Sequence, residues 1–422
     1  MSELNDNLQS GEIASARPRL AIKTNLLFAI LCALLASLYV GYLLWLASPF
    51  FDKISDMPEY VVAGKLYAEG HGSAAYSESE WLQRRTILFP TLRPRGLSMF
   101  SPPQSLPFFV ALALVPIKYV AAVWLALQVL ASALSLFLMK RLFMLNGEQT
   151  ALLWCAIFFS GPLFEALLIG QLAPFLLLAC VYCLISLEKN RALAAAIALS
   201  VFILKPQEIA TFAVFLLGAR KFKTLLYAAG IIGLLSIVSL ACAGPEVFTR
   251  YFDLMKNLDA LSSLMFPQIT PTVRGQMLRL GISVSVVAAV SKCLLLTGLL
   301  TSLWIGDRLR SSSNWVKLGA QATMPLGLLT AMYVQSYDLL ILAPSAVALF
   351  AAPAKTWIDR VLLALAAASL CLFIQPIFRF IHYDLKALPV NLHFAALLVF
   401  TACCITLAMR HAKPSTTRAV ND

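Results

Sequence analysis

The chain has 422 residues, of which 60% are hydrophobic and 13% are charged, and its formal net charge is +12. Soluble domains carry roughly 45–50% apolar and about 25% charged residues, so this composition excludes a soluble globular protein. The lysines and arginines stand in twos and threes between apolar runs, which is typical of membrane topology and not of a nucleic-acid surface. The nine cysteines lie mostly inside apolar runs without histidine partners, so they predict no metal site. We expect no cofactor, although three acids, Asp52, Asp56 and Glu59, could together hold Mg²⁺.

The first apolar run extends from Leu26 to Ala47 and is long enough to span a membrane. It lacks a convincing cleavage site, so we expect a retained first span after a cytoplasmic tail at 1–25. The one long polar interruption follows at 48–105, and we predict that it is the first extracytoplasmic loop. It opens with the acids Asp52, Asp56 and Glu59.

The start of this loop has the pattern of an interfacial helix. If 56–69 is helical, residues spaced by four, three and four share one face, namely Asp56, Tyr60, Ala63 and Tyr67. Ser55 as an N-cap and Pro58 in the first turn favour that helix. The pattern therefore predicts a carboxylate at the start of an interfacial helix, above an aromatic stripe.

The rest of the loop is basic and rich in proline. Its arginines stand close to Pro90 and Pro94 and are Arg84, Arg85, Arg93 and Arg95. An apolar run of about ten residues at 106–115 is too short to span. We predict two interfacial elements joined by a basic, proline-stiffened loop, which together form a platform at the membrane surface.

Beyond the loop, the chain reads as a series of apolar segments. A span needs about 20 apolar residues, and this length predicts an all-α bundle of about 10–12 transmembrane helices within 26–409. The clear candidates are 119–139, 150–169, 172–187, 225–243, 286–304, 318–334, 339–352, 361–377 and 392–409. The segment 192–219 is either a short hairpin that turns at Lys205-Pro206 or one kinked helix.

The positive-inside rule favours the hairpin. A single span at 192–219 would translocate cations that belong on the cytoplasmic side, namely Arg220, Lys221, Lys223, Arg308 and Arg310. The two arms are short, so we predict a partly re-entrant hairpin that is buried against protein or lines a cavity. This topology also gives a second extracytoplasmic loop at 244–280 and a cytoplasmic C-terminal tail at 410–422.

The topology places polar groups from distant segments in one extracytoplasmic layer. They are the first loop, Glu165, Gly170-Gln171, 205–208, 244–280, 335–338 and 379–386. An ionisable group inside the membrane costs about 2.5–3.5 kcal/mol on insertion scales, so it is rarely there without a partner or a cavity. We therefore predict a functional site on this side of a plasma (inner) membrane.

These residues resemble the GT-C superfamily of membrane glycosyltransferases that use polyprenyl-phosphate sugars, and within it glycosyltransferase family 87, which is mannosyltransferase-like. The motifs that carry the resemblance are, in order, Asp56 with Tyr60, then Ala63, Leu66, Gly70 and Tyr76, Phe100 to Pro103, Gly170-Gln171, Lys205-Pro206 and Tyr337-Asp338-Leu339. They cover about 45–345. The chain departs from the family in 332–336, where such proteins often have a Pro-His stretch.

The resemblance implies an inverting transfer of a hexose, with mannose as one candidate, from a polyprenyl-phosphate donor to an extracytoplasmic glycan or glycolipid. Such a reaction needs a base for the acceptor hydroxyl and cations for the leaving phosphate. Asp56 is the first candidate for the base, and Asp52 is the second. The structural alternative for Asp56 is a negative charge that the helix dipole favours at a helix start. The resemblance also implies the fold, which is a GT-C-like helix bundle in contact with membrane lipids.

The remaining candidate residues are expected to bind either the phosphate or the sugar of the donor. Lys205 is the first candidate for binding the donor phosphate, and its alternative explanation is snorkelling to the membrane interface. The weaker candidates are arginines, namely Arg84, Arg85, Arg93, Arg95 and Arg274. The sugar is expected to meet hydrogen-bonding or stacking side chains, namely Tyr60, Gln171, Tyr337 and Asp338. His382 is a further possible phosphate contact, and solvation is the ordinary explanation for it.

A transporter or a flippase for lipid-linked sugars is the alternative. It would also place charged groups against a cavity, but it should show internal repeats or paired broken helices. The sequence shows a single broken hairpin and no convincing self-similarity. A phosphate-binding glycine loop and a nucleophile elbow are absent from the sequence, so soluble-type catalysis has no support.

Overall fold

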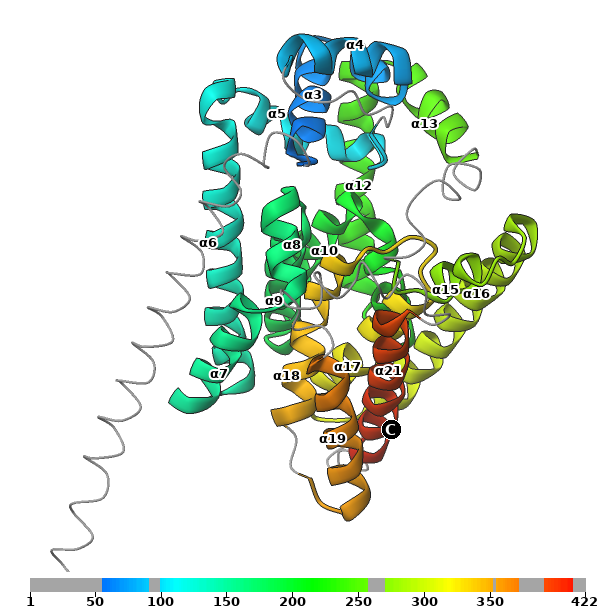
Figure 1. The fold of residues 1–422 in the computed structure, drawn as a ribbon. Coiled ribbons are helices and arrows are strands. Elements are labelled where there is room, and N and C mark those ends of the chain that lie inside the picture. Colours follow the sequence, from blue (N-terminus) through cyan, green and yellow to red (C-terminus); the bar gives the residue numbers. More distant parts are fainter. Residues whose placement is uncertain (1–54, 91–98, 257–269, 352–353, 372–390, 413–422) are drawn as a thin grey trace, which may run out of the picture.

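The computed structural model describes residues 55–90, 99–256, 270–351, 354–371 and 391–412. Every regular element in these ranges is helical, which confirms the predicted all-α class (Figure 1). Four of the described helices are long and apolar enough to cross a membrane, namely α6 (Ile117–Phe143), α12 (Phe222–Ala243), α16 (Val284–Leu309) and α21 (Leu392–His411). The chain is thus a multi-pass membrane protein. The predicted first span at 26–47 lies outside the described residues.

The segment 150–169, predicted as one span, is instead two helices. Only together are helix α7 (Gly147–Phe158) and helix α8 (Gly161–Ile169) long and apolar enough to span a membrane. The chain bends by 50° between them. The side chain of Ser160 accepts a hydrogen bond from the Leu163 amide at 3.2 Å and caps α8. Ser160 is in the extended conformation, and Pro162 in the first turn of α8 has no amide to continue the hydrogen bonds of α7, so a new helix starts here.

The predicted turn at Lys205-Pro206 is present. Helix α9 (Ala173–Glu188) is followed by α10 (Ala192–Ser200), the 3-10 turns η3 (Val201–Leu204) and η4 (Pro206–Glu208), and α11 (Ala210–Gly218). Lys205 separates the two turns with φ −148° and ψ 75°, the extended backbone expected before a proline. Helices α10 and α11 have nine residues each, about 14 Å, which is too short to cross a bilayer. How deeply this hairpin enters the membrane stays a prediction.

Three later candidate spans are shorter than a full crossing in the described residues. Helix α17 (Trp315–Thr330) has 16 residues, α18 (Ala343–Ala351) has nine and follows the 3-10 helix η6 (Ser336–Leu342), and α19 (Trp357–Cys371) has 15. The total of 10–12 spans therefore stays a prediction.

Short helices form a platform at one end of the molecule, at the top of Figure 1. They are α3 (Met57–Ala68), η1 (Gly72–Tyr76), α4 (Glu78–Leu88), α5 (Leu106–Ala113) and α13 (Glu246–Lys256). Tyr76 donates a hydrogen bond to the Ser101 carbonyl at 2.8 Å, and Arg250 of α13 pairs with Glu80 of α4 at 2.7 Å.

Three details of the platform differ from the sequence predictions. Asp56, not Ser55, is the N-cap residue of α3, and Ser55 accepts a hydrogen bond from the Met57 amide at 3.1 Å. Helix α3 is buried on most sides, because α5 packs so closely that a Cβ at Gly64 would lie 2.3 Å from the Phe109 carbonyl oxygen. Residues 84 and 85 belong to α4 and not to an irregular loop.

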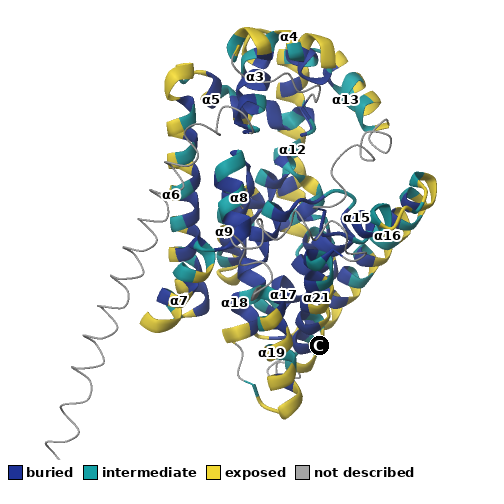
Figure 2. Ribbon diagram, viewed as in Figure 1, coloured by how far each residue is buried: buried dark blue, intermediate teal, exposed yellow. Residues whose placement is uncertain are grey.

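The buried core lies between the platform and the opposite end of the bundle. Figure 2 shows mostly buried residues along α8, α9 and α17, and exposed residues along the outer faces of α6 and α16. Exposed apolar side chains on those outer faces include Leu130 on α6 and Leu300 on α16. A face of this composition suits contact with lipid.

Candidate functional site

The C-terminal end of α8 holds the start of α3. The Asp56 amide donates to the Ile169 carbonyl at 2.7 Å, and the Ser55 hydroxyl donates to the same oxygen at 3.2 Å. Gly170 makes this approach possible: its φ is +74°, and a Cβ there would lie 2.8 Å from the Ser55 hydroxyl and 3.0 Å from the Met57 Cβ. Glycine alone adopts this backbone without strain.

The Asp56 carboxylate is oriented by a neutral amide. Gln171 donates from Nε2 to Asp56 Oδ2 at 2.5 Å and accepts from the Tyr60 hydroxyl at 3.4 Å. The Gln171 backbone carbonyl in turn accepts from Gln128 Nε2 at 2.6 Å. A buried amide with all these partners is held in one orientation. Gln171 therefore fixes the orientation of the Asp56 carboxylate at the start of α3.

An aromatic wall lines the same place. The Tyr60 ring stacks on Phe109 with centroids 5.0 Å apart and lies 5.6 Å from Trp124, whose indole N–H donates to the Gly170 carbonyl at 2.8 Å. The sequence predictions included Tyr60 and Gln171 but not Trp124 or Gln128. The sequence signal for Gln128 is a glutamine within the long apolar run of α6, and the structure shows that it is fully buried.

A second group of charges lies at the hairpin. Lys205 Nζ donates to Asp338 Oδ1 at 2.6 Å, lies 3.6 Å from Glu208 Oε1, and stands 4.7 Å over the Tyr337 ring centroid. Asp338 and Glu208 are 2% and 1% exposed. Asp338 Oδ2 also accepts from the Gln335 amide at 2.9 Å, which fixes the start of η6. We call Lys205, Glu208 and Asp338 the site cluster.

The two groups are joined where α8 packs against η6. Asp56 is bound to the C-terminal end of α8 and to Gln171, whereas Asp338 belongs to η6. Ser336 of η6 donates a hydrogen bond to Glu165 of α8. Through these contacts the polar residues near 56, 165, 171, 205 and 338 come together in the structure, and the side of the membrane on which they lie stays a prediction.

The predicted arginines lie in different surroundings. Arg84 pairs with Glu69, just after the C-terminal end of α3, and Asp56 lies at the other end of this 12-residue helix, about 18 Å away. Arg85 is buried with its guanidinium 5.6 Å over the Trp81 ring. Arg274 is 4% exposed on α15 (Val273–Arg279), which packs against α16 and α17. Their roles in phosphate binding stay predictions.

Several candidates cannot be placed. Asp52, Arg93, Arg95 and His382 lie outside the described residues. Within the part of the chain that is described, no three histidine, cysteine, aspartate or glutamate side chains gather as a metal site would need.

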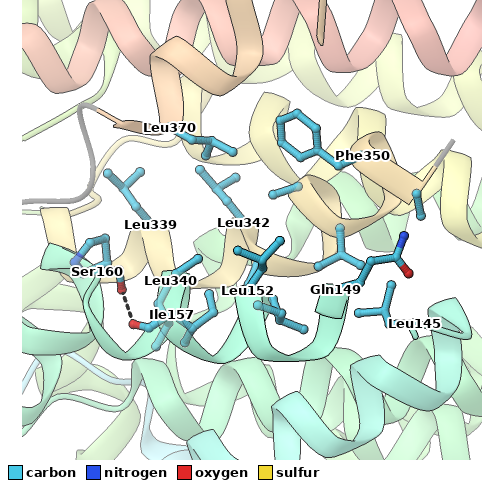
Figure 3. A pocket seen from close by; sticks show the side chains of 17 residues that line it. Leu145, Gln149, Leu152, Ile157, Ser160, Leu339, Leu340, Leu342, Phe350 and Leu370 are labelled. Carbon is cyan, nitrogen blue, oxygen red and sulfur yellow. Dashed lines mark hydrogen bonds between the residues drawn. The ribbon is translucent and has the colours of Figure 1, made fainter. Parts of the chain in front are cut away.

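An apolar cavity of about 370 Å³ lies beside the site (Figure 3). Its lining begins at Leu339, the residue after Asp338, and continues over Leu340 and Leu342 toward α18; α7 supplies the facing wall, including Leu152 and Ile157. Leu152 is 60% exposed, so the cavity reaches the outer surface of the bundle. The shape and lining suit a hydrocarbon chain.

The model of glycosyltransferase family 87 matches residues 100–330. No curated protein and no solved structure matches the chain. The matched region includes Gln171 and Lys205 and excludes Asp56 and Asp338, so these two acids are linked to the family region only through the contacts above. Since the match spans more than half of the 422 residues, the chain belongs to glycosyltransferase family 87 and is a membrane glycosyltransferase.

Proposed function

We propose that the enzyme transfers a hexose, with mannose as the first candidate, from a polyprenyl-phosphate donor to an extracytoplasmic glycan or glycolipid, with inversion at the anomeric carbon. One observation carries the proposal. A carboxylate, Asp56, and a cation, Lys205, come from segments about 150 residues apart. Asp56 is held at the C-terminal end of α8, Lys205 pairs with Asp338 of η6, and a hydrogen bond from Ser336 to Glu165 joins η6 to α8. A base and a phosphate-binding cation are the two groups that this reaction needs.

Asp56 is the proposed general base. In the proposed step it takes the proton of the acceptor hydroxyl while that oxygen attacks the anomeric carbon, and the bond to the donor phosphate breaks with its electron pair going to the phosphate oxygen. The amide of Gln171 leaves the carboxylate its negative charge, because an amide is neutral and contacts Oδ2 alone. A carboxylate has about four acceptor sites, so it can accept from an acceptor hydroxyl in addition to its amide partner.

Lys205 is the proposed partner of the leaving phosphate. The Lys205 side chain is 15% exposed, and its ammonium is paired with Asp338 at 2.6 Å. The donor phosphate would compete with Asp338 for the ammonium, and the displaced carboxylate could then accept a hydroxyl of the sugar. Tyr337, stacked under the ammonium, and Tyr60 supply the flat apolar surfaces that sugar rings favour.

The lipid nature of the donor is supported by the apolar cavity in Figure 3. Its volume is about 370 Å³, and its lining is dominated by leucine, isoleucine and alanine side chains that start one residue after Asp338. A polyprenyl chain buried there would leave its phosphate near Lys205. Each buried CH₂ contributes about 0.8 kcal/mol, so a few isoprene units suffice to hold the donor.

The orientation in the plasma membrane is supported by the distribution of cations. Helix α9 starts two residues after Gln171 and ends beside Lys189 and Arg191, so these cations lie at the opposite end of the helix from the site. The ends of α6 and α16 carry Lys140 and Arg308. Under the positive-inside rule these ends are cytoplasmic, and the site then faces the extracytoplasmic side.

The test uses membranes that contain the full-length protein and a radiolabelled polyprenyl-phosphate sugar. Asp56→Asn keeps the shape of the side chain and removes the base, so we expect transfer to fall by at least about 100-fold. Glu59→Gln is the matched control, because Glu59 lies one turn along α3, and it should keep transfer within about twofold. Transfer by Asp56→Asn at the wild-type rate, with normal insertion, would remove Asp56 as the base. Absence of transfer with every lipid-linked donor would favour the transporter.

A further inference from the structure

A basic cavity lies at the opposite end of the bundle from the site. Its volume is about 450 Å³, and two neighbouring turns line it: the turn between α9 and α10, with Asn190 and Arg191, and the turn between α11 and α12, with Arg220, Lys221 and Lys223. Four cations line this cavity, and no acid is among its lining residues. Glu188 stands nearby but is exposed and outside the lining.

The backbone adds further positive potential to the cavity. Helices α10 and α12 both begin here, and their N-cap residues, Arg191 and Lys221, make no side-chain cap hydrogen bond. The first amides of a helix point outward and carry partial positive charge, so two such ends beside four cations favour an anion.

One of the cations is held in an unfavourable backbone conformation. Arg220 has φ +58°, the left-handed region that glycine or asparagine usually occupies at a helix end. The corresponding residue of the other turn is Asn190, with φ +53°. An arginine at this position costs about 1 kcal/mol in backbone energy, while it adds a fourth cation to the lining.

The position of the cavity relates it to a membrane surface. Helix α9 runs from the proposed site to the cavity over 16 residues, about 24 Å, which is close to the hydrocarbon thickness of about 30 Å. Beyond the cavity, apolar side chains are exposed on both helices: Leu193 on α10 is 55% exposed and Leu226 on α12 is 70% exposed. A ligand here can therefore place an anion among the cations and apolar chains against these leucines.

We infer that this cavity binds the phosphate headgroup of an anionic phospholipid from the membrane leaflet opposite the proposed active site. The phosphate would contact the cations of the two turns, and the acyl chains would pack along α10 and α12. The inference does not depend on the proposed reaction, because it uses no residue near Asp56 or Lys205. A bound lipid would tie the two turns together at the open end of the hairpin, opposite its turn at Lys205-Pro206.

The test measures lipid retention by native mass spectrometry of the full-length protein with phosphatidylglycerol or phosphatidylcholine of identical acyl chains. Arg191→Gln/Lys223→Gln removes two lining cations and leaves Lys221, which stacks on Trp315 at 4.5 Å. Each cation contributes roughly fivefold to binding an anionic lipid, so we expect phosphatidylglycerol retention to fall about tenfold or more while phosphatidylcholine retention is unchanged.

The matched control is Lys140→Gln/Arg308→Gln, which removes two cations from the ends of α6 and α16, outside the cavity. It should retain phosphatidylglycerol like the wild type. An equal loss in the control would overturn the inference, because the lipid would then respond to general surface charge.

Inorganic phosphate at millimolar concentration serves as the soluble competitor and should not displace the lipid. Displacement that depends on Arg191 and Lys223 would assign the cavity to a soluble anion instead. Unfolding of both double variants in phosphatidylcholine is measured first, and single substitutions replace them if either unfolds early.

Discussion

Two regions of the molecule bring a buried carboxylate to a cation, and the balance of charge differs between them. In the site cluster, the single ammonium of Lys205 faces two carboxylates, Asp338 and Glu208. In the second group, which we call the end cluster, the single carboxylate of Asp359 faces Arg410 at 3.0 Å and His411 at 3.7 Å. The end cluster joins α19 to α21.

The surroundings of the two carboxylates explain the difference. Asp359 also accepts hydrogen bonds from two backbone amides at the start of α19, both at 3.0 Å, so its oxygens are fully supplied with donors. Arg410 is 38% exposed and keeps part of its contact with solvent. Such an arrangement is a structural tie. In the site cluster, the carboxylates of Asp338 and Glu208 can accept more hydrogen bonds than they receive. A substrate hydroxyl or phosphate that binds there would therefore change how Lys205 is paired, and such an arrangement suits a reaction site.

The largest effect is expected at Lys205. In Lys205→Gln the donor phosphate loses its cation, and transfer should fall by about 100-fold or more. The same change leaves two buried carboxylates without a counter-ion and should lower the free energy of unfolding by about 3 kcal/mol. Transfer assays and thermal unfolding in detergent measure the two effects.

The double variant Lys205→Gln/Asp338→Asn separates the two roles of the lysine. Removing the Asp338 charge should restore much of the stability, since Glu208 is then the single buried carboxyl in the site cluster and can be neutralised by taking up a proton, while transfer stays low. Recovery of transfer in the double variant would mean that Lys205 serves only to neutralise Asp338.

The second prediction concerns how closely the start of α3 must approach α8. Gly170→Ala places a Cβ 2.8 Å from the Ser55 hydroxyl, so Asp56 is displaced. A displacement of this order at a reacting group costs about 10-fold or more in rate. Gly281→Ala is the control, because Gly281 has the same φ of +74° but nothing lies within 4 Å of its added Cβ. Equal loss of transfer in both would assign the effect to backbone strain alone.

Much of the architecture followed from local sequence. The runs that become α6, α12, α16 and α21 are long and apolar, and their lengths alone predict membrane helices. The break at Lys205-Pro206 followed from the missing amide of proline. The bend between α7 and α8 was missed, because Ser160 and Pro162 lie inside an apolar run and hydropathy averages over them.

The site was predicted in outline but not in its pairings. Topology brought 56, 171, 205 and 338 to one layer, whereas no sequence pattern shows that Lys205 pairs with Asp338, 133 residues away. Such pairs depend on how α8, η4 and η6 pack, which is a property of the whole fold. The burial of α3 was missed for a similar reason, since it depends on the contact of Gly64 with α5.

A smaller effect on transfer is expected for a substitution of Glu208. It tests whether the second carboxylate of the site cluster matters for Lys205. Glu208→Gln keeps the shape of the side chain and removes one of the two carboxyl groups that compete for Lys205. The ammonium should then be more available to the donor phosphate, and the KM for the donor should fall about two- to fivefold with little change in kcat. Asp338→Asn is the comparison, because it also removes the 2.6 Å ion pair. An unchanged KM in Glu208→Gln would mean that Glu208 does not compete for Lys205.

The smallest effect on transfer is expected in the end cluster. Burial disfavours the Asp359 carboxylate, but hydrogen bonds from Arg410 and from backbone amides outweigh burial and lower its pKa to about 2. The ordinary pKa of aspartate is about 3.9, so the stabilisation is fully present above about pH 4 and is lost as the pH falls toward 2. Asp359→Asn should therefore lower the melting temperature at pH 7, weaken its dependence on pH between about 4 and 2, and leave transfer per folded molecule unchanged. A loss of transfer without a loss of stability would contradict the division between a structural tie and a reaction site, because it would couple α19 and α21 to the chemistry around Lys205.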